Sequence, residues 1–256
     1  METLQVDRAD GVVTVTFDRP HKKNAIDSQM WDELLVTAQQ IVGSTEDRCV
    51  VLTGAGGDFC SGADLSGEGG LRAHQLANMR RINTVIQAFH DLPQPTIAKI
   101  DGVAAGVGLN LALGCDLVVA SDRSRFSEIF AKRGLSLDGG GSWLLPRLVG
   151  MHKAKELALF ADVLPAEEAL RLGLVNRVVP SAELGALVLD WATRLAAGPP
   201  IALAMTKRML NRAFEQSFEQ ALDDEARAQT VNFGTRDTAE AIAAFLQKRD
   251  PTFEGR

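Results

Sequence analysis

The chain of 256 residues has few cysteines and histidines, and their scarcity excludes several kinds of site. The three cysteines are Cys49, Cys60 and Cys115. They are odd in number and lie in or beside apolar runs, which is typical of reduced, buried thiols rather than of a disulfide framework. Reduced thiols predict a cytoplasmic protein. The four histidines lie far apart without a ligand-spaced pair, so we expect no metal site.

Long apolar runs and an excess of basic residues are also missing. No stretch reaches the roughly 20 apolar residues that span a bilayer, and the N-terminal segment lacks the basic and then apolar pattern of a signal peptide. Lys and Arg number 27 against 33 Asp and Glu, which gives a net charge of -6. This charge disfavours binding to nucleic acid or to an anionic membrane, so we expect neither partner.

The sequence does contain a repeated order of strand, glycine-rich loop and helix. The expected elements of this kind are strand 49–53, loop 54–64, helix 71–91, strand 96–100, loop 101–108, helix 109–113 and strand 117–120. That order favours an α/β core with crossover connections. Both loops should open at one end of the sheet, where ligands of such folds bind and where several backbone amides would point at one spot.

Further elements flank this core. A hairpin at 4–17 should turn at Asp10-Gly11, and Asp27 or Ser28 can cap the helix that follows. From Ser142 onward the pattern is helical, with expected helices at 151–160, 165–172, 201–228 and 237–248 and a strand at 174–179. Gly198-Pro199-Pro200 is the clearest boundary, and it divides a core of residues 1–198 from a helical region of residues 199–256. That region either packs onto a neighbouring subunit or covers its own core.

Common catalytic motifs are absent. The sequence contains no Gly-x-x-x-x-Gly-Lys-Ser/Thr phosphate loop and no Gly-x-Ser-x-Gly nucleophile elbow. Gly106 and Gly108 supply two glycines of a dinucleotide fingerprint, but Leu111 occupies the third position. These absences disfavour a phosphate-loop enzyme, a serine hydrolase and a nicotinamide enzyme.

Asp138 is the carboxylate with the most unusual neighbours. It lies between the apolar Leu137 and three glycines, and a side chain so placed is partly desolvated unless it faces a ligand. It caps the helix that starts near Ser142, forms part of a turn, or acts as a general base.

Several separated motifs, in order, resemble the crotonase superfamily, which is the enoyl-CoA hydratase and isomerase group. They cover nearly the whole chain and stand at 24–27, 59–65, 95–121, 139–142, 147–150, 168–169, 173–175 and 245–253. The resemblance implies an α/β fold, a spiral of repeated strand, strand, helix turns with a C-terminal helical tail that builds trimers or dimers of trimers. It also implies an acyl-CoA thioester as substrate, with coenzyme A entering as part of that substrate and no separate cofactor.

The resemblance also assigns site residues. The amides of Ala63 and Val107 would form the oxyanion hole for the thioester carbonyl. Residues that would bind substrate or its coenzyme A part are Lys22, Lys23, Ala25, Ala63, Asp64, Leu65, Gly106, Gly108, Trp143 and, across a subunit boundary, Lys248.

Departures from the family pattern bear on the reaction. The two glutamates of the hydratases align with Asn110 and Phe130. Addition of water needs a positioned base and acid, so simple hydration is disfavoured. Glu128, two residues from Phe130, is a possible replacement, which leaves a hydratase as one alternative.

Asp138 matches the position used by isomerase and dehalogenase members. With Trp143 and the residues after it, this part of the chain is most similar to ring-epoxide isomerases of phenylacetyl-CoA breakdown and to isomerases that convert 3-enoyl-CoA to 2-enoyl-CoA. We therefore predict that Asp138 moves a proton from C2 to C4 while the two amides hold the enolate. The remaining alternatives are an inactive acyl-CoA binding protein and a dehalogenase.

Overall fold

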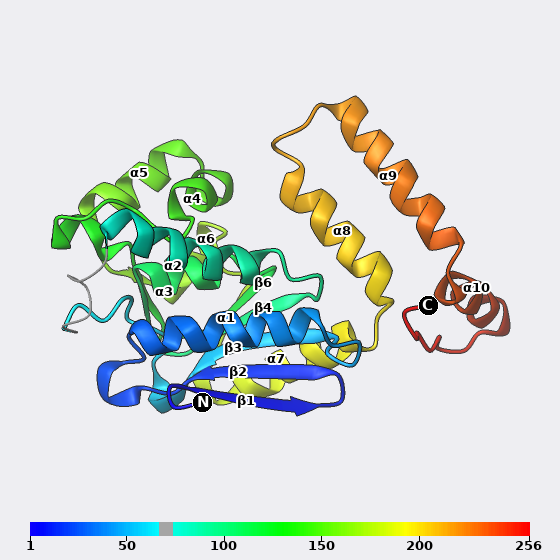
Figure 1. The fold of residues 1–256 in the computed structure, drawn as a ribbon, viewed down its shortest axis with the longest axis horizontal. Helices are drawn as coiled ribbons and strands as arrows, with labels where there is room; N and C mark the ends of the chain where they lie inside the picture. The colour runs from blue at the N-terminus through cyan, green and yellow to red at the C-terminus, as the bar shows by residue number, and fades with distance from the viewer. Residues whose placement is uncertain (67–73) are drawn as a thin grey trace.

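A six-stranded sheet organises the N-terminal three quarters of the chain (Figure 1). The computed structural model describes residues 1–66 and 74–256. Only the first pair of strands is antiparallel, as expected for the hairpin, and the remaining neighbours are parallel. In sheet order the strands are β1 (Leu4–Ala9), β2 (Val12–Phe17), β3 (Cys49–Gly54), β4 (Thr96–Ile100), β6 (Leu117–Ser121) and β9 (Arg177–Val179).

The two faces of this sheet bury different apolar clusters. Along β3, Val50 and Leu52 face one cluster, while Cys49 and Val51 face the other, which is the period of two expected of a strand. Helices α1 (Ser28–Val42) and α2 (Gln75–His90) cover the first face. Helix α7 (Ser181–Ala196) covers the second with Leu184, Val188, Ala192 and Ala196. Asp27 caps α1, since its Oδ1 accepts from Met30 N–H at 2.9 Å.

A second, three-stranded sheet completes the spiral. Its strands are β5 (Val103–Ala105), β7 (Arg125–Ser127) and β8 (Leu164–Pro165). Strand β4 of the large sheet leads to β5 of the small sheet and then to α3 (Val107–Leu113). Strands β6 and β7 and the short 3-10 helix η4 (Ile129–Arg133) repeat this order. The expected turns of strand, strand and helix are therefore present.

Several predicted elements differ from the structure. The strands of the second sheet were not located along the sequence, because strands of two or three residues are too short to show a period of two. The strand predicted at 174–179 is confined to β9, and residues 71–73 of the helix predicted at 71–91 lie outside the described residues. The helix predicted at 165–172 is α6 (Ala166–Arg171), with Pro165 as its N-cap rather than its first residue.

The single helix predicted at 201–228 is wrong, because the chain forms α8 (Pro200–Arg212) and α9 (Phe218–Phe233). Ser217 Oγ accepts from Gln220 N–H at 3.3 Å, and Gln220 Oε1 accepts from Ser217 N–H at 2.8 Å. This capping box starts a new helix. The Ser-x-x-Gln spacing was the sequence signal for the break. The remaining helices are α4 (Gly141–Val149), α5 (Met151–Phe160) and α10 (Arg236–Gln247).

Helices α8, α9 and α10 extend away from the sheet (Figure 1). None of the helices in the described ranges has both the length and the apolar character needed to cross a bilayer. A partly buried ion pair ties α8 to the core, where Lys207 Nζ lies 2.8 Å from Asp116 Oδ2 and 3.1 Å from Gln94 O. Asp116 Oδ2 also accepts from Thr96 N–H and Oγ1–H. A division of the chain at residue 198 remains our proposal.

Replacement of this lysine should weaken the attachment. Lys207→Met leaves the carboxylate of Asp116 without its cation, so we expect the free energy of unfolding to fall by about 2 to 3 kcal/mol. Urea unfolding followed by circular dichroism measures the change, with Lys155→Met on an exposed lysine of α5 as the control. Equal free energies of unfolding for Lys207→Met and Lys155→Met would show that the ion pair of Lys207 with Asp116 does not stabilise the protein.

Candidate active site

Two glycine-rich loops lie side by side at the centre of the candidate site. Cys60 and Ala104 form a parallel bridge between them, and Cys60 O accepts from Ala105 N–H at 2.9 Å. Ala63 and Val107 each stand three residues beyond the bridge on their own loop. The sheet therefore brings together the two loops whose amides were assigned to the oxyanion hole.

The amide of Ala63 faces away from the bonds that fix its loop. Ala63 forms a parallel bridge with Ile26, in which Ile26 N–H donates to Gly62 O at 2.8 Å and Asp64 N–H donates to Ile26 O at 2.9 Å. The N–H of the residue between them points to the opposite side. A Cβ built on Gly62 would lie 3.2 Å from Ala105 O, so the two loops pack closely against each other here.

Val107 is the first residue of α3, and the first amides of a helix have no partner within it. Gly106 precedes it with a φ of 54°, which favours glycine. Val107 itself is helical, so its Cβ causes no strain. Gly108 is glycine for packing reasons, since a Cβ there would lie 2.5 Å from Cys60 Sγ. A role for Gly108 in substrate binding therefore stays a prediction.

Asp138 stands on a glycine turn that packs against α3. Gly139 and Gly140 have φ values of 59° and 87°, and a Cβ on Gly139 would lie 2.9 Å from Val107 Cγ2. Gly140 is the N-cap of α4 and no side chain caps that helix, so the alternative in which Asp138 caps it is wrong. Asp138 Oδ1 is buried, without a hydrogen-bond partner among the described residues. Burial raises the pKa of Asp138 to about 6.

The two positions aligned with hydratase glutamates hold an amide and an aromatic ring. Asn110 is fully buried on α3, and its Nδ2 donates to Glu128 Oε2 at 3.2 Å and to Asp138 O at 2.8 Å. Phe130 Cζ would lie 3.8 Å from a Cβ on Gly106. Glu128 therefore reaches the surroundings of Asp138 through Asn110, a contact between residues 18 positions apart that the sequence left open.

Glu128 is itself an unusual carboxyl group. It is 2% exposed, and its Oε1 has no hydrogen-bond partner among the residues described. Burial raises the pKa of Glu128 to about 8, the hydrogen bond from Asn110 opposes this, and the charge of Asp138 adds to it. At neutral pH the site thus holds one ionised carboxylate, Asp138, and one protonated carboxyl, Glu128.

The residues assigned to coenzyme A gather at one edge of these loops. Residues 22–26 run beside residues 61–64, where Ser61 N–H donates to Lys23 O at 3.0 Å. Lys22 Nζ donates to Ser66 Oγ at 3.0 Å, and Lys23 Nζ lies 3.8 Å from Asp58 Oδ2. Ala25 is buried beneath them and Leu65 is 69% exposed.

Arg19 is the organising residue of that edge, and sequence reasoning missed it. Its guanidinium lies 2.9 Å from Asp64 Oδ2 and 3.1 Å from Asp27 Oδ2, and it donates to Ala25 O. Hydrogen bonds from the hydroxyl and amide of Ser66, and then from Arg19, hold the pKa of Asp64 well below its usual value. Asp64 is therefore a structural anion and not a base. No local pattern links Arg19 to a partner 45 residues away.

Trp143 lines a cavity of about 490 Å³ beside the glycine turn. Arg147 Cζ lies 3.8 Å from the centre of the Trp143 ring and 5.6 Å from that of Phe214, in the segment after α8. His90 meets the same indole edge to face, with ring centres 5.8 Å apart. Gly139, Gly140 and Leu144 complete the wall next to Asp138. Asp138 is not among the lining residues, but Gly139, the next residue in the chain, is.

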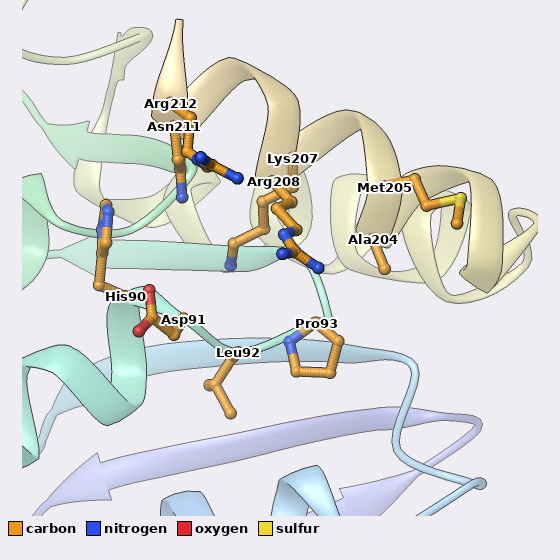
Figure 2. A pocket seen from close by; sticks show the side chains of 10 residues that line it. All are labelled: His90, Asp91, Leu92, Pro93, Ala204, Met205, Lys207, Arg208, Asn211 and Arg212. Carbon is orange, nitrogen blue, oxygen red and sulfur yellow. The ribbon is translucent and has the colours of Figure 1, made fainter. Parts of the chain in front are cut away.

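An adjoining cavity of about 520 Å³ lies between the end of α2 and α8 (Figure 2). Figure 2 shows Lys207 and Arg208 extending from α8 toward the segment that holds Leu92 and Pro93. None of the predicted site residues lines it. We therefore place the candidate active site at the smaller cavity, which Gly139, Gly140 and Trp143 line.

Lys248 is the predicted site residue that lies apart from the others. It ends α10, and α10 stands at the opposite side of the molecule from α3 and α4 (Figure 1). Within one chain Lys248 therefore does not join the site, and its assignment across a subunit boundary stays a prediction. In the described ranges no three His, Cys, Asp or Glu side chains gather closely enough to hold a metal ion.

Known proteins match this chain over nearly its full length. A family model described as enoyl-CoA hydratase/isomerase matches residues 7–256. The chain is 38% identical over 256 residues to a probable enoyl-CoA hydratase of Rhodobacter capsulatus, covering 99% of this chain and 98% of that protein. It is 36% identical over 251 residues to 1,2-epoxyphenylacetyl-CoA isomerase of Escherichia coli K12, covering 96% of each.

A solved structure has the same fold. The enoyl-CoA hydratase of Bacillus anthracis superposes with a TM-score of 0.95 at 32% identity, covering 99% of this chain and 100% of that one. The similar proteins thus carry both hydratase and isomerase names.

The burial of Asp138 predicts a stability change that does not depend on any reaction. Its folded pKa of about 6 lies above the unfolded value of about 3.9, so the native state loses stability as pH rises through this window. Asp138→Asn should therefore raise the free energy of unfolding at pH 8 by about 1 to 2 kcal/mol, below the full linkage value because solvent still screens this carboxyl. At pH 5 the gain should be smaller. Urea unfolding at both pH values tests this, and an equal effect at pH 5 and pH 8 would contradict it.

Proposed function

The chain belongs to the enoyl-CoA hydratase/isomerase family of the crotonase superfamily, and on that premise we propose that it is an isomerase that moves a double bond in an enoyl-CoA thioester. The observation that carries the proposal is the partly desolvated carboxyl group of Asp138, on a loop packed against the helix that begins with Val107. The next two residues of that loop, Gly139 and Gly140, line the cavity that Trp143 also lines.

The oxyanion site lowers the barrier to forming an enolate. When a proton leaves C2 of a 3-enoyl-CoA, the electron pair of the C2–H bond delocalises onto the thioester oxygen. The amides of Ala63 and Val107 stabilise that charge without reorganisation, because the sheet already fixes their loops. Loss of one such donor typically costs about 3 to 4 kcal/mol of barrier, so two amides account for a large share of the catalysis.

Asp138 supplies the proton transfer. Its carboxylate takes the proton from C2, and the resulting carboxylic acid returns it at C4. The double bond moves from C3–C4 to C2–C3, and the enzyme regains its starting state. A pKa of about 6 suits both steps, because the group is ionised at neutral pH and more basic than an ordinary aspartate.

A hydratase is the second candidate, and the position of Glu128 favours it. This carboxyl adjoins Asn110 and holds a proton at neutral pH, as an acid for C2 would. Its near-complete burial argues against direct activation of a water molecule, since that water would need access to the carboxyl. Phe130 and Asn110 supply no carboxylate in its place. We therefore rank isomerisation above hydration.

We also propose that the tail assembles the protein into trimers or dimers of trimers. Large apolar side chains on α8, α9 and α10 and on the segments that join them stand in solvent in the single chain. The most exposed are Leu210, Phe214, Phe218, Phe233, Phe245 and Leu246, of which Phe245 is 82% exposed. Association of copies would remove this surface from water.

Activity assays separate the candidate reactions. Purified protein is supplied with 3-enoyl-CoA and with 2-enoyl-CoA, and double-bond migration and water addition are followed separately. We expect migration, with Asp138→Asn lowering kcat by about 100-fold to 10,000-fold because the general base is lost. Asp122→Asn, at an exposed aspartate, is the matched control.

Other outcomes identify the alternatives. Undiminished migration in Asp138→Asn would refute the role of Asp138. Hydration without migration would favour the hydratase, and tight acyl-CoA binding without turnover would favour a binding protein.

Light scattering tests the assembly. At micromolar concentration we expect a mass of three or six times the 27.5 kDa chain. Phe245→Glu should lower that mass, because burial of an unpaired charge opposes association. A monomeric unmodified protein would refute the proposal.

A further inference from the structure

One buried amide connects the two carboxyl-bearing segments of the site. Asn110 has two amide hydrogens, and its Nδ2 donates to Asp138 O at 2.8 Å and to Glu128 Oε2 at 3.2 Å. The first bond holds the backbone of Asp138. The second holds the side chain of Glu128, which directly precedes η4. Rotation of the amide by half a turn would put its oxygen against these two acceptors, so the pair of bonds fixes its orientation.

The glycine turn lies directly on this amide. A Cβ built on Gly141 would stand 2.5 Å from Asn110 Nδ2, and one on Gly139 would stand 3.2 Å from Asn110 Cβ. The turn therefore has no room to move toward α3. Its position, and with it that of Asp138, depends on how the Asn110 side chain is held.

We propose that Glu128 is a positioning residue for the isomerisation, which keeps Asn110 in the orientation that fixes Asp138. The inference rests on the proposed function. Glu128 does not touch the reacting carbons in this arrangement, because Asn110 stands between it and the glycine turn. A proton on Oε1, the oxygen without a partner, leaves Oε2 free to accept from Asn110.

The charges around Glu128 come from few groups. The charge of Asp138 is the one that raises the pKa of Glu128. Strand β5 and helix α3 contribute apolar residues, glycine and the neutral Asn110 to its surroundings. On η4 itself Lys132 is paired with Asp162 at 3.0 Å and Arg133 is exposed. On α5, which packs against η4, Lys153 is paired with Glu156 at 2.7 Å, and His152 and Lys155 are exposed.

This arrangement predicts a pH profile with two limbs. Activity should rise as Asp138 ionises near pH 6 and fall as Glu128 ionises near pH 8. The fall follows because a second negative charge in a buried site opposes the charge that develops on the enolate. A purely structural role for Glu128 would not produce an alkaline limb that disappears with its carboxyl group.

Two substitutions at one position separate the hydrogen bond from the titration. Glu128→Gln retains an acceptor for Asn110 but does not ionise, so kcat at pH 7 should stay within about threefold of the unmodified enzyme, and the alkaline limb should vanish. Glu128→Leu removes the acceptor, and kcat should fall by about tenfold or more with KM changed less, because the base is displaced. Glu46→Leu, at an exposed glutamate of the loop after α1, is the control.

Carboxyl carbon NMR without substrate keeps this inference distinct from the proposed function. Glu128 should titrate near pH 8 in the unmodified protein and at lower pH in Asp138→Asn, where the neighbouring charge is gone. This measurement also serves if Glu128→Leu fails to fold. If the protein shows no turnover but the titration of Glu128 still moves to lower pH in Asp138→Asn, the isomerase is refuted while the coupling of Glu128 to Asp138 is supported. Titration of Glu128 near its ordinary value, or an alkaline limb that persists in Glu128→Gln, would overturn the inference.

Discussion

The parallel bridge between Cys60 and Ala104 is the constraint on which the site depends. It locks two loops that leave different strands into one register, so that the segments bearing Ala63 and Val107, 44 positions apart in the chain, lie side by side. The tight contact between Gly108 and Cys60 then seats the first turn of α3 against this bridge. Any larger residue at either contact would separate the loops, and the preorganisation that an oxyanion site requires would be lost.

The carboxyl groups add a second constraint, which is electrostatic. Asp138 and Glu128 are both desolvated, and a site with two adjacent buried anions would be unfavourable at neutral pH. Their surroundings raise the two pKa values by different amounts, to about 6 and about 8. At neutral pH one group is therefore ionised while the other keeps its proton. The molecule holds this arrangement at the expense of stability, as is common where a buried group must react.

Sequence patterns predicted the elements whose signals are local. The buried strands, the hairpin turn and the cap at Asp27 follow from residues near one another in the chain. The strands of the small sheet could not be located in the sequence because they are too short to display a period. The contacts of Asn110 with Glu128 and of Arg19 with Asp64 escaped prediction for another reason, since both join residues far apart that meet only after the sheet has formed. Asp138 stood out because its apolar and glycine neighbours are adjacent in the sequence.

The stack of Arg147 on Trp143 has a consequence for optical spectroscopy. The chain contains no tyrosine and three tryptophans, so its fluorescence comes from indole rings alone. Trp31 is sealed in the core and Trp191 lies on α7, with Arg177 5.9 Å from its ring. Trp143 is thus the indole beside the candidate base, with a cation on its face and a cavity at its side. The protein therefore carries its own fluorophore in the wall of the cavity at the candidate site.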